Sequence, residues 1–439
     1  MLRKLSLITF FSISYLLAAC GGGNTSTTPI VQAVQVTVQP AAANVSDFRT
    51  QQFTATVTGT SNTAVNWQVS GIAGGNQKLG FVSANGLYIA PSSVATKPDG
   101  KGNTVTTTVK VTAVSQANTV ATNSATVTIV PDNANTQTAP VLLGSTGGNT
   151  NDSINTTTNG KPTITCCGGT LGSLVTRGGT QYILSNTHIL ARSDAATIGD
   201  AIIQPGLIDT PTCTAPGTTT VANLSQFFNL QNGPNPKIDA AIAQVVSGKV
   251  DPAGKIIYLG ATVDANNVPV ADAPQAGTGL PVAGIVPNLA VAKSGRSTGL
   301  TCSTIEATNI STSVDYTMNC DGTGTKFTVP YTNQIGVIGG DFSAEGDSGS
   351  LIVTQADANP VALLYAGSDK DSVGNPVSDV LNFFASGSSN MTFVGGAAHA
   401  VVGCTLPTAP HSAEKVVPQL LEASILQKAV ATRDLHAPE

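Results

Sequence analysis

Three short segments of the chain carry residue types that together can perform acyl transfer. A serine, Ser348, stands in the run Gly-Asp-Ser-Gly-Ser that begins at Gly346. Its flanking glycines allow a tight turn that presents the hydroxyl outside the sheet. A serine becomes nucleophilic when a base removes its proton, and a carboxylate that orients the base improves the transfer. His188 and Asp239 stand upstream and supply one group of each kind, so the order is His, Asp, Ser.

The setting of Asp239 favours it over the other acids that follow the histidine. Asp239 lies in the apolar run Ile-Asp-Ala-Ala-Ile-Ala, where an unpaired carboxylate is costly. An imidazole N–H satisfies such a carboxylate and fixes the histidine tautomer. Three alternatives, Asp194, Asp200 and Asp209, lie among turn residues, where aspartate commonly forms a cap or an Asx turn.

The sequence around these residues resembles that of bacterial trypsin-like serine peptidases. The similarity covers roughly residues 165–400 and rests on the Gly-Asp-Ser-Gly-Ser run together with four further motifs. These are Gly-Gly-Thr-Leu-Gly-Ser-Leu-Val from Gly168, Tyr-Ile-Leu-Ser-Asn-Thr-His-Ile-Leu from Tyr182, Gly-Asp-Ala-Ile-Ile-Gln-Pro-Gly-Leu-Ile-Asp from Gly199, and Lys-Ser-Gly-Arg-Ser-Thr-Gly from Lys293. Together with the frequent short strands, the resemblance predicts a chymotrypsin-like double β-barrel over residues 161–403.

Carried over position by position, the resemblance implies a role for each residue. His188 would be the general base, Asp239 its orienting acid and Ser348 the nucleophile. The backbone N–H groups of Gly346 and Ser348 would form the oxyanion hole. The implied substrate is a protein or peptide, and no cofactor or metal is expected.

The resemblance also assigns two residues to the substrate pocket. Phe342 matches the base of the primary pocket, and its uncharged side chain disfavours a strict preference for Arg or Lys. Tyr365 begins an edge on which a peptide could pair as an added strand.

The family's Ile-Val-Gly-Gly start is missing from this sequence. In the family, the carboxylate at the position of Asp347 pairs with a newly cut N-terminus, so Asp347 needs another partner.

The first residues resemble a bacterial lipoprotein signal. A basic start and a short apolar run over residues 1–19 precede Leu-Ala-Ala-Cys-Gly, which resembles a lipobox. Cys20 would then be the lipidated first residue, followed by a tether over residues 20–30. The expected location is the cell envelope, on the outer membrane in a bacterium with two membranes. An ordinary cleaved signal is the alternative.

Residues 31–130 alternate between apolar and polar positions in strand after strand, which predicts a β-sandwich. The runs around Trp67 and Tyr88 resemble the bacterial Ig-like family of surface domains, so a spacer or adhesive module is expected. Residues 131–160, rich in Asn, Thr, Gly and Ser, predict a linker. Within the final segment, residues 404–439, apolar positions at helical spacing between Glu414 and Leu435 predict an amphipathic helix.

Six cysteines follow Cys20, and an exported protein can oxidise them. Cys302 and Cys320 bracket a hairpin-like stretch and are expected to pair. The partners among Cys166, Cys167, Cys213 and Cys404 stay open, although the adjacent Cys166 and Cys167 should take different ones.

The composition excludes one class of partner. Only 10% of residues are charged and the net charge is −5, so a nucleic-acid footprint is absent. The sequence thus predicts an all-β envelope serine endopeptidase that contacts the membrane through its lipid. The rivals are an inactive surface adhesion or scaffold protein and an esterase; the order Ser, Asp, His of an α/β-hydrolase is not found.

Overall fold

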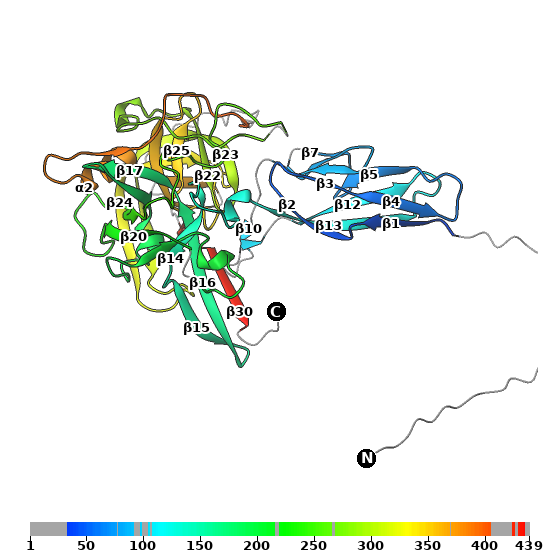
Figure 1. Ribbon diagram of the computed structural model, residues 1–439, viewed down its shortest axis with the longest axis horizontal. Coiled ribbons are helices and arrows are strands. Elements are labelled where there is room, and N and C mark those ends of the chain that lie inside the picture. Colours follow the sequence, from blue (N-terminus) through cyan, green and yellow to red (C-terminus); the bar gives the residue numbers. More distant parts are fainter. Residues whose placement is uncertain are drawn as a thin grey trace, which may run out of the picture.

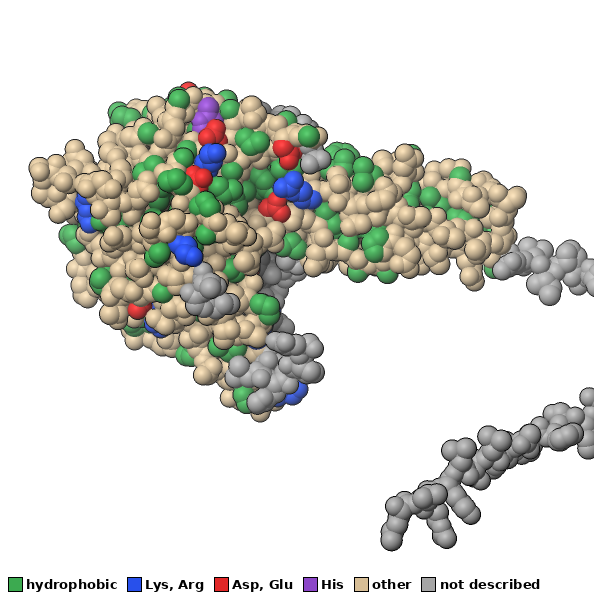
Figure 2. Space-filling model, viewed as in Figure 1, with side chains coloured by type: hydrophobic (Ala, Val, Ile, Leu, Met, Phe, Trp, Pro, Cys, Tyr) green, Lys and Arg blue, Asp and Glu red, His purple; other side chains and the backbone are tan. Residues whose placement is uncertain are grey.

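The structure is a computed structural model that describes residues 33–76, 78–91, 97–98, 104–105, 108–215, 219–265, 268–368, 370–404, 424–425 and 429–434. Among these residues, β-strands are the dominant regular structure and helices are few and short. Figure 1 shows an elongated N-terminal part beside a rounded C-terminal part. The face drawn in Figure 2 carries few charged side chains, as the composition predicts. Within the described ranges no helix is long and apolar enough to cross a membrane.

Up to Val130, the described residues form thirteen strands. The five-stranded sheet has the order β2-β13-β12-β5-β6, the four-stranded sheet has the order β3-β9-β8-β7, and β1 pairs with β4 and β10 with β11. The bounds are β1 (Gln35–Gln39), β2 (Ala42–Ser46), β3 (Thr50–Gln52), β4 (Thr54–Thr58), β5 (Val65–Val69), β6 (Ile72–Ala73), β7 (Gly75–Asn76), β8 (Gly80–Val82), β9 (Leu87–Ile89), β10 (Lys97–Pro98), β11 (Thr104–Val105), β12 (Thr108–Ser115) and β13 (Thr122–Val130).

Alternating side chains explain why these segments form sheets with one buried face. In β12, Val109, Val111 and Ala113 are buried while the residues between them are more exposed. They belong to one core with Trp67 on β5 and Tyr88 on β9, so both larger sheets contribute to it. The all-β prediction for this region is confirmed.

A ten-stranded sheet forms the first half of the C-terminal part. Its order is β15-β16-β14-β19-β20-β21-β18-β17-β28, and β30 pairs with β16 off this path. The bounds are β14 (Ser145–Asn149), β15 (Ser153–Thr158), β16 (Lys161–Leu171), β17 (Ser173–Arg177), β18 (Thr180–Ser185), β19 (Ala201–Ile203), β20 (Thr220–Phe227), β21 (Ala241–Val245), β28 (Met391–Phe393) and β30 (Ala429–Asp434). The short helices are α1 (Thr187–Leu190), α2 (Val377–Phe384), η1 (Asp132–Ala134), η2 (Leu207–Asp209) and η3 (Val282–Gly284).

A seven-stranded sheet forms the second half. Its order is β25-β22-β23-β24-β27-β26-β29, and β25 also pairs with β26, so six strands form a closed ring. The bounds are β22 (Ala290–Gly295), β23 (Gly299–Thr317), β24 (Lys326–Ile338), β25 (Leu351–Thr354), β26 (Pro360–Gly367), β27 (Asp371–Pro376) and β29 (Ser424–Ile425). The long hairpin of β23 and β24 carries two tyrosines to the candidate site.

Two predicted segments differ in the structure. Residues 131–160 are not a linker, because they contain η1 and two strands of the ten-stranded sheet. All five residues of β14 are buried, and a Cβ on Gly147 would lie 2.4 Å from Leu171 Cγ, so its small residues allow close packing rather than a loose connection.

The predicted C-terminal helix is also wrong where the structure describes it. β29 and β30 are strands that pair with β26 and β16, and the rest of residues 414–435 lies outside the described residues. Long-range strand pairing therefore overrides the helical spacing of the apolar residues.

The disulfides correct one predicted pair. Cys302 bonds Cys404, Cys167 bonds Cys320, and Cys166 bonds Cys213. The pairing of Cys302 with Cys320 is wrong because most of β23 runs extended between them, a span of roughly 50 Å at the usual rise. The prediction that the adjacent Cys166 and Cys167 take different partners is confirmed.

The two parts of the protein meet at a polar junction in which Asp47 and Tyr258 are buried. Tyr258 donates its hydroxyl to Asp132 (2.6 Å) and to Asp47 (3.4 Å), and its ring packs edge-on against Phe48. Arg49 pairs with Asp132 at 3.1 Å. Figure 2 shows acidic and basic side chains gathered where the elongated and rounded parts join. These contacts fix the N-terminal part against the C-terminal part.

Asp47 makes this junction sensitive to pH. Its side chain is fully buried, and burial, with the neighbouring Asp132 charge, raises the pKa of Asp47 from 3.8 to about 8. The folded protein therefore holds a proton that the unfolded chain has lost, and stability decreases as pH rises from 3.8 through 8. Asp47→Asn, which mimics the protonated acid, is expected to remove most of this decrease. Urea unfolding followed by Trp67 fluorescence at several pH values measures the free energy of unfolding. Asp357→Asn, at an exposed position, is the control. If the free energy of unfolding of Asp47→Asn decreases with pH as steeply as that of the wild type, the assignment is wrong.

Candidate functional site

His188 is held at the point where β18 ends. Asn186 precedes α1, and its side-chain amide donates to the Asp239 carbonyl at 2.7 Å. Thr187 donates its hydroxyl to the carbonyls of Phe228 (2.9 Å) and Ala240 (2.8 Å). The side chains on both sides of the short helix thus lock it to the neighbouring loop. His188 is 1% exposed.

Asp239 lies opposite the histidine because their strands pair. Ser185 at the end of β18 is in register with Ala241 at the start of β21, which brings the following and preceding residues together. His188 Nδ1 lies 2.5 Å from Asp239 Oδ2, and the His188 backbone N–H donates to Oδ1 at 3.2 Å. The carboxylate therefore holds Nδ1–H and leaves Nε2 as the acceptor. The predicted pair is brought together.

Two further groups hold Asp239 in place. Tyr316, on the long hairpin, donates its hydroxyl to Asp239 Oδ2 at 2.9 Å. Asn375 accepts the Asp239 backbone N–H at 2.9 Å, and its own amide donates to Gln334. Asp239 is fully buried, so the Tyr316 hydroxyl, the His188 backbone N–H and the imidazole replace the water that its charge has lost.

Ser348 lies in the turn between β24 and β25. Gly346 and Gly349 have φ angles of 92° and 95°, which favour glycine. The Ser348 carbonyl accepts the N–H of Thr170 at 2.9 Å, and the Thr170 carbonyl accepts the Ser185 hydroxyl at 2.6 Å. The serine turn, β16 and the end of β18 are therefore in direct contact, three residues before His188.

The serine hydroxyl and the free imidazole nitrogen are not bonded to each other. Ser348 Oγ donates to the Tyr365 carbonyl at 3.4 Å. Within the described part of the chain, no group hydrogen-bonds His188 Nε2, although this atom is buried. Catalytic hydrogen bonds are often long before substrate binds, and a rotation of the serine side chain changes its partner. The arrangement supplies a buried base with one open acceptor beside the serine turn.

Gly346, predicted to contribute to the oxyanion hole, is bonded through its carbonyl. Its carbonyl accepts the Thr170 hydroxyl at 2.9 Å. In the described residues its N–H donates to no group. A backbone N–H without an internal partner can receive a developing oxyanion.

Asp347 has an internal partner, Lys293. Its Nζ lies 3.2 Å from Asp347 Oδ2, and both side chains are fully buried. Asp347 also accepts the N–H groups of Ser297 (2.8 Å), Thr298 (3.2 Å) and Ala344 (2.9 Å). Burial lowers the pKa of Lys293 more than Asp347 raises it, so the ion pair only partly replaces lost hydration. The turn before the serine is thus fixed from inside the protein.

A tyrosine cluster surrounds the acid. Tyr316 and Tyr331 share a hydrogen bond of 2.6 Å, and the Tyr331 and Tyr365 rings lie 4.7 Å apart. Burial and the Asp239 charge raise the pKa of all three hydroxyls well above 10. They therefore remain protonated, and Tyr316 remains a donor to the carboxylate.

The remaining predicted residues have other surroundings. Phe342 is buried in the core of the closed ring, with its ring 5.8 Å from Lys293 Nζ. Tyr365 offers its carbonyl to Ser348 while its ring points into the tyrosine cluster. Cys20 lies outside the described residues. No group of three or more His, Cys, Asp or Glu side chains suited to a metal occurs among the residues described.

The alternative acids make other contacts. Asp194 accepts the backbone N–H groups of Leu230 and Gln231, Asp200 accepts an amide N–H of Asn149, and Asp209 pairs with Arg296 at 2.5 Å. None of these hydrogen bonds involves the histidine. Sequence reasoning missed Tyr316, Tyr331 and Asn375, whose approach depends on the long hairpin and β27. Lys293 lay within a recognised motif, but the motif did not indicate its partner.

Neither a protein-family model nor a curated protein matches the chain.

Proposed function

We propose that the protein is a serine endopeptidase that hydrolyses peptide bonds through an acyl-enzyme. The observation that carries this proposal is the buried contact of 2.5 Å between His188 and Asp239, with Nε2 left without a hydrogen-bond partner among the described residues. A buried imidazole oriented by a carboxylate is the base that a serine nucleophile requires.

The reaction follows from these groups. Ser348 Oγ turns from the Tyr365 carbonyl, gives its proton to His188 Nε2 and attacks the peptide carbonyl carbon. The N–H groups of Gly346 and Ser348 receive the oxyanion. His188 then gives the proton to the leaving amine as the C–N bond breaks. Water, deprotonated by the same imidazole, hydrolyses the acyl ester and restores the serine.

Two features of the fold support a more specific proposal, a chymotrypsin-like peptidase with an Ig-like domain. The closed ring of six strands and the order His, Asp, Ser are what a chymotrypsin-like peptidase requires, and the N-terminal sheets suit an Ig-like sandwich. Because Lys293 already pairs with Asp347, the serine turn needs no newly cut N-terminus.

The location proposed is the cell envelope. A lipid on Cys20 would hold the protein on a membrane, with its N-terminal part as a spacer and protein or peptide as substrate. Nucleic acid has no place in this function, because the net charge is −5.

A fluorophosphonate probe tests the proposed function. Such probes phosphonylate a serine only when a base activates it, so we expect an adduct on Ser348 in the folded protein. Mass spectrometry locates the adduct, and Ser348→Ala should remove it, whereas Ser350→Ala should keep it. If no adduct forms on the full chain or on the chain from which the C-terminal strands have been removed, the peptidase proposal is wrong and an inactive scaffold protein is the better explanation.

A further inference from the structure

The chain's own C-terminal strands lie on both sides of the serine turn. β29 pairs antiparallel with β26, so that Ile425 is opposite Ala366 and Ser424 is opposite Gly367. β30 pairs antiparallel with β16, from Ala429 opposite Gly168 to Asp434 opposite Thr163. Two short strands of the C-terminal region thus add to one strand of the seven-stranded sheet and to one strand of the ten-stranded sheet.

Ser348 lies between the same two strands. Its hydroxyl donates to the carbonyl of Tyr365, one residue before the part of β26 that β29 covers. Its carbonyl accepts the N–H of Thr170, two residues after the part of β16 that β30 covers. The residues that contact Ser348 on β26 and β16 are therefore close in sequence to the residues that pair with β29 and β30.

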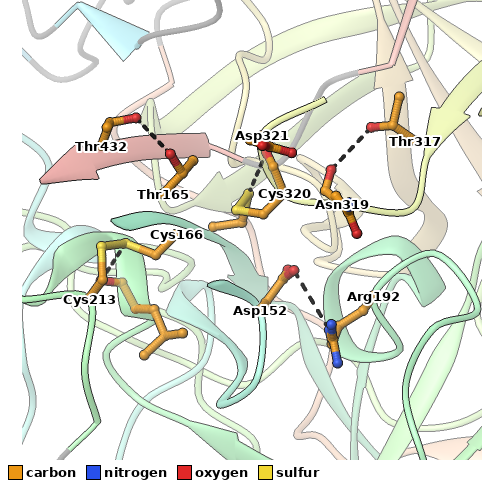
Figure 3. The surroundings of a disulfide bond; sticks show 12 residues. Asp152, Thr165, Cys166, Arg192, Cys213, Thr317, Asn319, Cys320, Asp321 and Thr432 are labelled. Carbon is orange, nitrogen blue, oxygen red and sulfur yellow. Dashed lines mark hydrogen bonds and ion pairs between the residues drawn. A yellow bond between two sulfur atoms is a disulfide. The ribbon is translucent and has the colours of Figure 1, made fainter. Parts of the chain in front are cut away.

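Side-chain contacts hold β30 on its edge. Thr432 and Thr165 point toward one another across the paired strands, with hydroxyl oxygens 3.0 Å apart (Figure 3). Arg433 donates to the Ile208 carbonyl at 3.1 Å. Figure 1 shows β30 lying beside β16. Strand addition of this kind binds through main-chain hydrogen bonds and accepts many sequences.

The burial of the candidate catalytic side chains agrees with a strand edge that is already occupied. Ser348 and Asp239 are 0% exposed and His188 is 1% exposed. A peptide carbonyl cannot approach a hydroxyl that no solvent reaches. An open strand edge is also a place where another chain would pair, so some occupant is needed.

We propose that the edges of β26 at Ala366–Gly367 and of β16 at Thr163–Gly168 form one binding site for an extended polypeptide. Its resident occupant is the protein's own segment that carries β29 and β30, which excludes substrates until it is released. This inference rests on the proposed function and names its regulation. A tethered segment acts at an effective concentration of about 1 mM, so even weak strand addition blocks an external peptide.

The test releases the segment from the folded protein. A recognition site for a sequence-specific protease is inserted between Cys404 and Ser424, the full chain is folded, and the segment is then cut and removed by dialysis. We expect fluorophosphonate labelling of Ser348 to become about tenfold faster or more. A synthetic peptide of residues 424–434 should reverse the gain, whereas a scrambled peptide should not.

A second measurement separates this inference from the proposed function. A fluorescent 424–434 peptide is titrated into the cut Ser348→Ala protein, and binding is followed by anisotropy, which needs no catalysis. Binding without any labelling in cut wild-type protein would refute the peptidase but keep the occupied site. Labelling of Ser348 that occurs at the same rate before and after the cut, or no binding of the peptide, would overturn the inference. In the uncut chain, Ile425→Pro with Ala431→Pro should reproduce the faster labelling, because proline lacks the N–H for pairing.

Discussion

Replacing Asp239 with asparagine is expected to lower kcat for peptide hydrolysis by about 10⁴-fold. In the wild-type protein, the Asp239 carboxylate accepts Nδ1–H of His188 at 2.5 Å and the hydroxyl of Tyr316 at 2.9 Å. An asparagine amide can instead donate to Nδ1, which places the proton on Nε2, where it blocks transfer from the serine. Hydrolysis of a fluorescein-labelled unfolded protein, measured after release of the C-terminal strands, gives the rate.

Two variants sharpen this result. Asp194→Asn is the matched control, because Asp194 bonds backbone N–H groups of another loop and should leave kcat unchanged. Tyr316→Phe keeps the ring and removes one donor to Asp239, so a smaller loss of about tenfold is expected. If Asp239→Asn retains a rate within tenfold of the wild type, the buried pair is structural and His188 is not oriented by it for catalysis.

Replacing Lys293 with methionine is expected to destabilise the protein by about 3–5 kcal/mol. The substitution keeps most of the side-chain volume but leaves the Asp347 carboxylate buried without its cation. The three backbone N–H groups that Asp347 accepts offset part of the lost charge, which places the cost within the range for broken buried pairs. Urea unfolding measures the free energy, with exposed Lys255→Met as control.

The double variant Lys293→Met with Asp347→Asn tests the cause. Removing both charges should recover at least half of the lost stability, because a neutral amide is far less costly to bury than an unpaired carboxylate. A cost for Lys293→Met below about 1 kcal/mol would show that the ion pair does not hold the serine turn. A cost that the second substitution does not reduce would assign the loss to packing instead.

Local patterns predicted the parts of the fold whose causes are local. Strand alternation around Trp67 and Val111 identified the N-terminal sheets, because one face of each strand is buried. The residues of the His188–Asp239 pair were recognised from short motifs, since the apolar setting of Asp239 demands a partner. In each case the reason lies within a few residues of the feature.

The features that sequence reasoning missed depend on contacts between distant segments. Tyr316 reaches Asp239 only because β23 continues past the closed ring. Cys320 bonds Cys167 for the same reason, which a search for local pairs could not find. β14 reads as a loop by composition, yet it is buried because glycine and serine allow strands to approach closely. The final strands have helical spacing but form the edges of two sheets.

The junction at Tyr258 has a consequence for how the protein presents itself. Asp47 and Asp132, from one part, share a phenol with the other part, and Arg49 closes the contact. A rotation of the N-terminal part would have to break the contacts of the buried Tyr258 and Asp47, so this part is a rigid extension rather than a flexible linker. A partner that binds the N-terminal sheets would therefore also set the direction in which the serine turn faces.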